Sequence, residues 1–275
     1  MKNLFNYISR KSPIHDLTGA TKLICMLLWT FAAMLTYDTR ILIVLPILSF
    51  ILFGVSKIKL KDVSFMIGFT LVFMVLNNIL VFLFSPEHGV ELYGTCHEIC
   101  PLWGGKMLTY EQLWYHLNLV LKYLSQIPII LLFICTTQPS EFAASLNRIG
   151  VKYSIAYSVS LALRYIPDIQ REYNDISKAQ QARGIEMSNK VSLINRLKSA
   201  SSILVPLIVM SMDRIDVISN AMELRGFGKG KKRTWYMARP FTKFDILSIV
   251  FCAIIFALAI ASNVIRGTRF WSPWM

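Results

Sequence analysis

Residues 176–184 read I-S-K-A-Q-Q-A-R-G, and residues 218–226 read I-S-N-A-M-E-L-R-G. Both copies follow the pattern I-S-x-A-x-x-x-R-G. The isoleucine and the arginine are about two helical turns apart, so they share one face of a helix. A glycine directly after the arginine is the usual residue for a left-handed helix cap. The repeat therefore predicts two helices of similar design, each ending in an arginine.

An arginine followed by a glycine also marks an ordinary helix end, because the arginine complements the helix dipole. Two copies with the same fixed positions favour a paired function instead. Upstream of each arginine, largely apolar residues recur every three or four positions: Ile166, Ile169, Tyr173, Ile176 and Ala179 before Arg183, and Leu204, Leu207, Ser211, Ile215, Ile218 and Met222 before Arg225. Charged residues such as Asp168, Arg171 and Glu172 are expected mostly on other faces. An arginine that ends an apolar stripe is expected to bind a carboxylate or carbonyl groups.

The composition indicates an integral membrane protein. The chain has 275 residues, 55% of them hydrophobic, and a mean hydropathy of +0.50. Soluble domains are less apolar, at about 45–50%. The net charge of +13 is compatible with basic inside loops, anionic lipid or an acidic protein partner. Nucleic acid is a poor fit, because no basic run is interleaved with stacking aromatics outside the apolar segments.

Five apolar segments are predicted to be transmembrane helices in an all-α fold: Leu23–Tyr37, Ile41–Val55, Val63–Phe84, Leu113–Cys135 and Phe244–Val264. The first two are short for a hydrocarbon core of about 30 Å. Only three residues, from Asp38 to Arg40, separate them, which predicts a tight hairpin. The first segment lacks a clear processing site and is interpreted as a retained span, not a signal peptide.

The charges of the loops predict the orientation in the cell membrane. Basic residues precede the first segment and recur at Lys57, Lys59 and Lys61, whereas the loop 85–112 carries four glutamates and one lysine. By the positive-inside rule the N-terminus is cytoplasmic and the acidic loop lies outside. Arg266 and Arg269, after the last segment, then lie outside, which is a mild violation of the rule.

The sequence divides into three regions: a four-span region at 1–136, a cytoplasmic region of long amphipathic helices at 137–240, and a last span with its tail at 241–275. The segment 138–239 carries 16 basic and 8 acidic residues. Its apolar runs, Ile155–Ile166 and Ile203–Met212, are too short to cross a membrane. A crossing at the second run would also place the two arginine motifs in different compartments. Long amphipathic helices, bent at Pro167 and Pro206, are expected here.

Other candidate residues carry weaker signals. His88, Cys96, His97 and Cys100 share the acidic loop, but their spacing matches no standard metal site. A Cys96–Cys100 disulfide and plain loop residues both remain open. Lys122, inside the fourth segment, is expected to snorkel or to contact neighbouring helices. The basic tract Lys229–Arg233 suits anionic lipid.

Five short motifs, in order along nearly the whole chain, resemble the transmembrane T component (EcfT or CbiQ-like) of energy-coupling-factor ABC transporters. Ser12–Leu17 resembles the family's S-x-x-H-x-L opening, and Thr136–Glu141 resembles its T-T-x-P-x-E junction. Ala162–Pro167 resembles its A-L-R-[FY]-[IV]-P run, and Ala179–Gly184 resembles the first Ala-Arg-Gly signature. The second Ala-Arg-Gly signature matches at Ala221–Phe227, with Leu224 in place of an alanine.

The resemblance implies a non-catalytic scaffold. Two ATPase subunits that bind ATP and Mg would dock at the helix ends, and a membrane-embedded substrate-binding S component would contact the apolar faces and deliver a vitamin or metal ion. The residues implied for ATPase docking are Ala182, Arg183, Gly184, Leu224, Arg225 and Gly226, and those implied for S-component contact are Ile166, Ile169, Leu204 and Leu207. No catalytic, cofactor-binding or metal-binding residue is assigned to this chain.

Two other classes of function are weighed against this one. An integral-membrane enzyme acting on phosphorylated lipid would use the basic region for phosphate, but only Asp213 and Asp216 form a close acidic pair. A self-contained channel or carrier is disfavoured because the spans offer few polar residues. No P-loop motif is present, so ATP hydrolysis is expected in other subunits.

Overall fold

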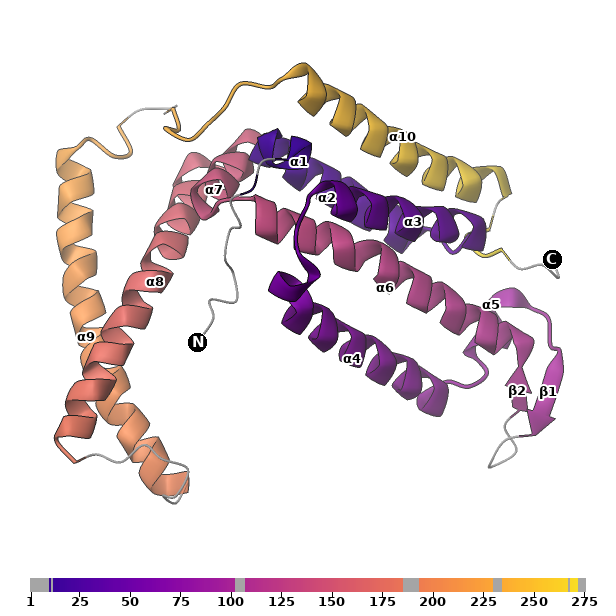
Figure 1. Cartoon of the computed structure of the whole chain (residues 1–275), viewed down its shortest axis with the longest axis horizontal. Helices are drawn as coiled ribbons and strands as arrows, with labels where there is room; N and C mark the ends of the chain where they lie inside the picture. The colour runs from indigo at the N-terminus through magenta and orange to yellow at the C-terminus, as the bar shows by residue number, and fades with distance from the viewer. Residues whose placement is uncertain are drawn as a thin grey trace. The chain divides into compact units, whose positions relative to one another are not determined.

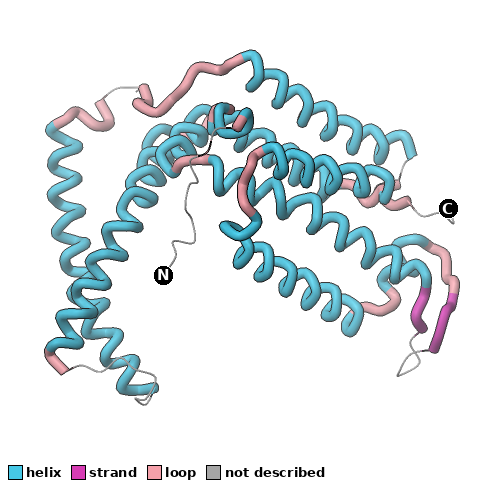
Figure 2. The backbone as a smooth tube through the Cα atoms, in the orientation of Figure 1, coloured by secondary structure: helices cyan, strands magenta, loops and turns pink. Residues whose placement is uncertain are grey.

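The structure is a computed structural model that describes residues 10, 12–101, 107–184, 193–229, 234–266 and 268–271 (Figures 1 and 2). At 100–101 and 193–198 only the backbone is described. The chain forms two compact units, one made of Met1–Gln138 with Arg239–Met275 and the other of Pro139–Ala238.

The first unit is an assembly of helices with one small hairpin of strands. Its elements are α1 (Pro13–Asp16), α2 (Gly19–Leu35), α3 (Thr39–Val55), α4 (Leu60–Phe84), α5 (His88–Tyr93), β1 (Glu98–Pro101), β2 (Met107–Thr109), α6 (Tyr110–Thr136) and α10 (Lys243–Arg266). β1 and β2 pair antiparallel. The short α5 and the hairpin were not predicted from the sequence.

The five predicted apolar helices are all present. α4, α6 and α10, with 25, 27 and 24 residues, are long and apolar enough to cross a membrane, and α2 and α3 are shorter apolar helices of 17 residues. Seventeen residues of helix span about 25 Å, close to the hydrocarbon thickness of about 30 Å. These helices confirm the all-α membrane fold.

The predicted hairpin between α2 and α3 is also present, and Asp38 organises it. Its carboxylate accepts a hydrogen bond from the Arg40 backbone N–H at 3.1 Å, and so caps α3. The same buried carboxylate accepts from the Ser262 hydroxyl at 2.9 Å and pairs with the Arg266 guanidinium at 2.7 Å. Arg266 therefore neutralises Asp38, which gives this basic residue a structural role independent of the positive-inside rule.

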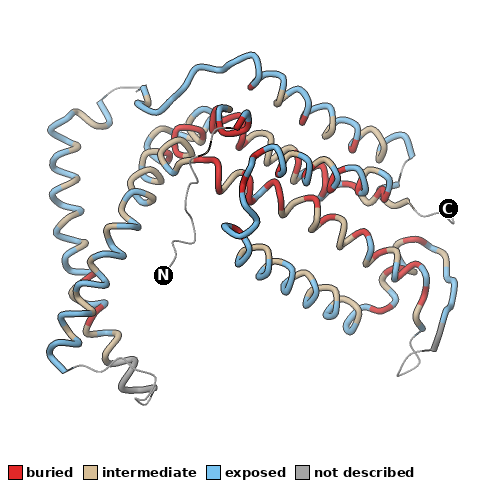
Figure 3. The backbone as a smooth tube through the Cα atoms, viewed as in Figure 1, coloured by how far each residue is buried: buried red, intermediate tan, exposed pale blue. Residues whose placement is uncertain are grey.

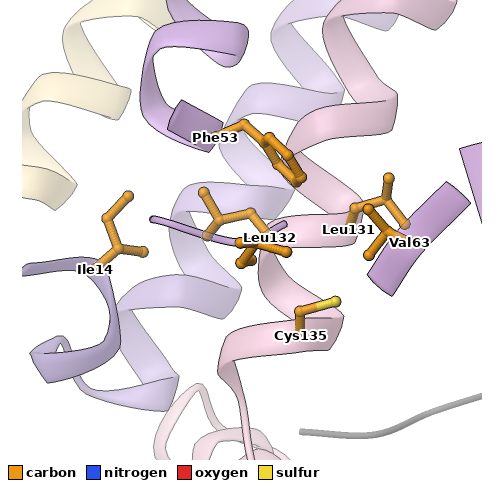
Figure 4. Packing of buried hydrophobic residues seen from close by; sticks show 7 residues of the cluster. Ile14, Phe53, Val63, Leu131, Leu132 and Cys135 are labelled. Atoms are coloured by element: carbon orange, nitrogen blue, oxygen red, sulfur yellow. The ribbon is translucent and has the colours of Figure 1, made fainter. Parts of the chain in front are cut away.

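Buried apolar side chains form two clusters in the first unit. Figure 3 marks the buried residues along the backbone. One contains Phe53 of α3, Val63 of α4 and Leu132 of α6, and Figure 4 shows these side chains converging with Ile14, Leu131 and Cys135. The other gathers Trp29 of α2, Leu42 and Leu45 of α3, and Cys252 of α10. Together they pack α2, α3 and α4 against α6, and α10 against α2.

Two buried lysines connect α2 and α6 reciprocally. Lys22 of α2 donates to the Thr136 carbonyl at the end of α6, at 2.9 Å. Lys122 of α6 donates to the Met34 carbonyl near the end of α2, at 3.1 Å, and its ammonium lies 3.2 Å from the centroid of the Tyr37 ring. Cations stabilise helix C-termini by bonding the last carbonyls. Contact with a neighbouring helix therefore accounts for Lys122.

The loop before α6 is fixed by Glu111. Its carboxylate accepts from the Thr95 hydroxyl at 3.0 Å and the His97 backbone N–H at 3.1 Å, and it lies 2.6 Å from His97 Nδ1. Cys96 is a free, exposed thiol, whereas the side chain of Cys100 lies outside the described residues. In the described part of the chain, no group of three His, Cys, Asp or Glu residues is arranged to hold a metal ion.

The second unit consists of α7 (Pro139–Arg148), α8 (Tyr153–Ala182) and α9 (Leu193–Leu224). α8 has 30 residues and α9 has 32, about 45 and 48 Å of helix. Pro167 and Pro206 both lie inside these helices. Gln180 contacts Ser202 and Glu172 contacts Arg214, so α8 and α9 run antiparallel where they cross (Figure 1).

Candidate functional site

The first arginine motif forms the end of α8. Arg183 is the exposed C-cap residue, and its backbone N–H donates to the Ala179 carbonyl at 3.3 Å. Gly184 follows with a φ of +83°, and its N–H donates to the Gln181 carbonyl at 3.0 Å. A Cβ at Gly184 would meet nothing within 4 Å. Glycine is thus required here by the left-handed backbone and not by close packing.

The second motif ends α9 with the same cap. Gly226 has a φ of +69°, and its N–H donates to the Glu223 carbonyl at 2.8 Å. The Phe227 N–H donates to the Met222 carbonyl at 2.9 Å, which completes the paired hydrogen bonds of a Schellman motif. The two Arg–Gly stretches therefore form two helix tips of similar backbone geometry.

The side chains of both tips are presented outward. Ala182, Arg183, Leu224 and Arg225 are all exposed, and Leu224 is 90% exposed. Each Å² of apolar surface that stays in water costs about 25 cal/mol of free energy relative to burial. Each tip thus combines a cation with an apolar or small neighbour, which suits a docking surface for another protein.

The predicted apolar stripe is mostly exposed. Ile166 and Ile169 of α8 are 48% and 38% exposed, and Leu204 of α9 is 47% exposed. Leu207 differs, because it is 8% exposed and packs inside the unit. Further exposed apolar side chains of α9 are Val205, Ile208, Val209, Met212, Ile215 and Val217. A run of exposed apolar residues of this extent marks an interaction surface.

The crossing of α8 and α9 contains an ion pair that the sequence pattern did not identify. The guanidinium of Arg214 contacts the carboxylate of Glu172, and it also lies 5.7 Å from the centroid of the Tyr165 ring. The Glu172 and Arg214 side chains are 20% and 32% exposed. Hydrogen bonding to Glu172 raises the pKa of Arg214. Helical periodicity assigned Glu172 to a polar face, and that face meets α9.

Aromatic residues fix the segment around the second tip. The Phe227 ring lies 4.8 Å from Tyr157 and 5.9 Å from Tyr153 between centroids, and Trp235 lies 5.3 Å from Tyr153. Trp235 Nε1 donates to the Asn147 side-chain oxygen at 3.0 Å. These contacts hold the residues after Arg225 against the start of α8 and the end of α7.

The described residues of this unit show little that resembles a metal site for an enzyme acting on phosphorylated lipid. Asp213 and Asp216 are both exposed, and the described residues place no third acidic, His or Cys side chain with them in a group that could hold a metal. Carboxylate-bound metal ions are the usual means by which enzymes stabilise a transferring phosphoryl group. The tract Lys229–Arg233 falls outside the described residues beyond Lys229.

Five apolar helices and a separate unit of two long, similarly capped helices define an all-α integral membrane protein. The chain belongs to the CbiQ family, since the family model described as "Cobalt transport protein" matches residues 10–236.

Curated relatives bear the name "Energy-coupling factor transporter transmembrane protein EcfT". One from Bacillus selenitireducens is 29% identical over 273 residues, covering 95% of this chain and 96% of its own length. One from Heliobacterium modesticaldum is 30% identical over 234 residues, covering 84% and 86%. One from Limosilactobacillus fermentum is 35% identical over 111 residues, and this alignment spans only 41% of that relative.

Proposed function

We propose that this protein is the membrane-embedded coupling subunit of an ATP-driven uptake transporter; its curated relatives are named transmembrane proteins of energy-coupling factor transporters. One observation carries the proposal: one unit presents two helix ends with the same left-handed glycine cap and an exposed arginine. Two similar tips suit two similar partners. The partners proposed are two ATPase subunits, which bind ATP and Mg, one at each tip.

The exposed apolar stripe supports the second contact. Ile166, Ile169 and Leu204 leave 48%, 38% and 47% of their surface exposed. Such a surface fits a membrane protein that supplies an apolar face of its own. The partner proposed is one membrane-embedded S component, which holds the vitamin or metal ion to be transported. The second unit is proposed to lie on the cytoplasmic side, together with the N-terminus.

The proposed mechanism follows from the length of the two helices and from their contact at the crossing. ATP binding draws the two ATPases together, and each tip moves with its ATPase. Because α8 and α9 cross and are joined by the Glu172–Arg214 pair, movement of the tips changes the angle at the crossing. That change moves the apolar stripe and the S component on it. This chain supplies coupling and no catalytic group.

The experiment is co-purification of the ATPase subunits with the tagged chain from membranes. Reversing both tips with Arg183→Glu and Arg225→Glu should abolish recovery of the ATPases, because each new glutamate would face carbonyl or carboxylate groups with the wrong charge. Lys178→Glu is the matched control, since Lys178 is exposed on α8 but not at its tip. Full recovery of the ATPases with the doubly reversed chain would contradict the docking proposal.

A further inference from the structure

The first unit contains a cavity of about 390 Å³. It lies among α1, α2, α6 and α10, with one residue of α3, and its wall is mainly aliphatic and aromatic. This volume falls within the range of about 300–1,000 Å³ that is usual for small-molecule sites. Nothing in the proposed coupling role uses the cavity.

The wall of the cavity changes from buried to exposed along its length. Trp29, Lys22 and Cys252 line its inner part and are 1%, 4% and 6% exposed. Leu247 and Phe251 of α10 also line it, and they are 65% and 43% exposed. The cavity therefore leads from the surface of α10 into the core. α10 is long and apolar enough to cross a membrane, so its exposed apolar surface is expected to face the bilayer.

The chemistry of the wall excludes water as the natural occupant. An ordered buried water needs two to four polar partners. The principal polar group is the Lys22 ammonium, which already donates to the carbonyls of His15 and Thr136. Apolar side chains that face a void forgo their dispersion contacts on that side. A hydrocarbon chain from the adjoining bilayer restores those contacts without any cost of desolvation.

We propose that this cavity binds one acyl chain of a membrane phospholipid. The chain enters past Leu247 and Phe251 and ends against the Trp29 ring. It then packs against α2, α6 and α10 at once, and serves as a structural element of the helix bundle. The headgroup stays in the lipid layer outside, so the site selects for an acyl chain and not for a particular headgroup.

Trp29 provides the readout for a direct test. Its buried Nε1 has no hydrogen-bond partner among the described residues, so Trp29→Phe removes no described hydrogen bond. The full chain is reconstituted in phosphatidylcholine vesicles whose acyl chains carry bromine at mid-chain, and in unbrominated vesicles. The emission of wild type minus that of Trp29→Phe reports Trp29 alone. Brominated lipid should remove most of this emission, and unchanged emission would overturn the proposal.

A pair of substitutions on α10 separates a chain in the cavity from lipid around the protein. Ser248→Phe places a ring at a half-buried residue of the cavity wall, whereas Ile254→Phe changes a residue that is 54% exposed and outside the wall. Ser248→Phe should restore Trp29 emission in brominated vesicles, and Ile254→Phe should leave it quenched. Equal quenching in both variants would overturn the proposal. This comparison also works on total emission, should Trp29→Phe fail to fold.

Discussion

Glu172 of α8 pairs with Arg214 of α9, and the two residues stand at equivalent positions of the internal repeat. They are 42 residues apart, and each precedes the isoleucine of its I-S-x-A-x-x-x-R-G motif by one helical turn. Two copies of one helical pattern thus cross antiparallel, with opposite charges where the copies meet. Like charges at both positions would repel, so this difference between the copies favours the crossing.

Exchanging the two charges tests this relationship. Glu172→Arg alone should lower the melting temperature of the purified chain and the recovery of ATPase subunits, because two guanidinium groups then meet at the crossing. The double variant Glu172→Arg/Arg214→Glu should recover most of both losses. Arg171→Glu is the control, since Arg171 is 79% exposed and exposed pairs contribute little. If the double variant matches the single variant in melting temperature and ATPase recovery, the ion pair does not determine how the two helices cross.

Gly184 offers a test of the helix cap itself. Gly184→Ala should destabilise the end of α8 by about 1–2 kcal/mol, because an alanine at φ +83° adopts the left-handed region at a steric cost. Gly54→Ala is the control: Gly54 lies inside α3, and a Cβ there also meets nothing within 4 Å. Denaturant unfolding of the purified variants measures the difference. Equal stabilities would mean that the cap does not depend on glycine.

The helices and their caps could be predicted from the sequence because apolar runs and Arg–Gly stops act locally. The identity of the residues that meet across helices could not. Periodicity placed Glu172 on a polar face and Leu207 on the apolar stripe. Which of these side chains become buried depends on how α8 and α9 cross. Likewise, Arg266 looked misplaced by its charge alone, and only the fold brings it to Asp38, which lies 228 residues earlier in the chain. Local rules contain no information about such distant contacts.

Leu204 and Leu207 lie one turn apart on α9, and substitutions at them should have different effects. A substitution at Leu204 should affect partner binding, and one at Leu207 should affect stability. Leu204→Asp should leave the folded chain stable, since Leu204 is 47% exposed, but should release the S component proposed to cover it. Leu207→Ala should cost about 2–5 kcal/mol, the usual range for removing a buried leucine. Thermal unfolding and recovery of a small membrane protein with the tagged chain measure the two effects. Retention of that protein by the Leu204→Asp chain would exclude Leu204 from the contact.

Phe227 is expected to position the second helix tip. Phe227→Ala removes its contacts with Tyr153 and Tyr157, which should destabilise the unit by about 1–3 kcal/mol, because each aromatic pair contributes about 0.5–1.5 kcal/mol. The Arg225 tip then loses its fixed direction, and recovery of ATPase subunits should fall by more than in Tyr236→Ala, whose ring is fully exposed in the wild type. Adding Arg183→Glu to each variant leaves docking to depend on the Arg225 tip, so the difference should widen. If Phe227→Ala and Tyr236→Ala recover the ATPases equally in that background, the aromatic contacts stabilise the unit without positioning the tip.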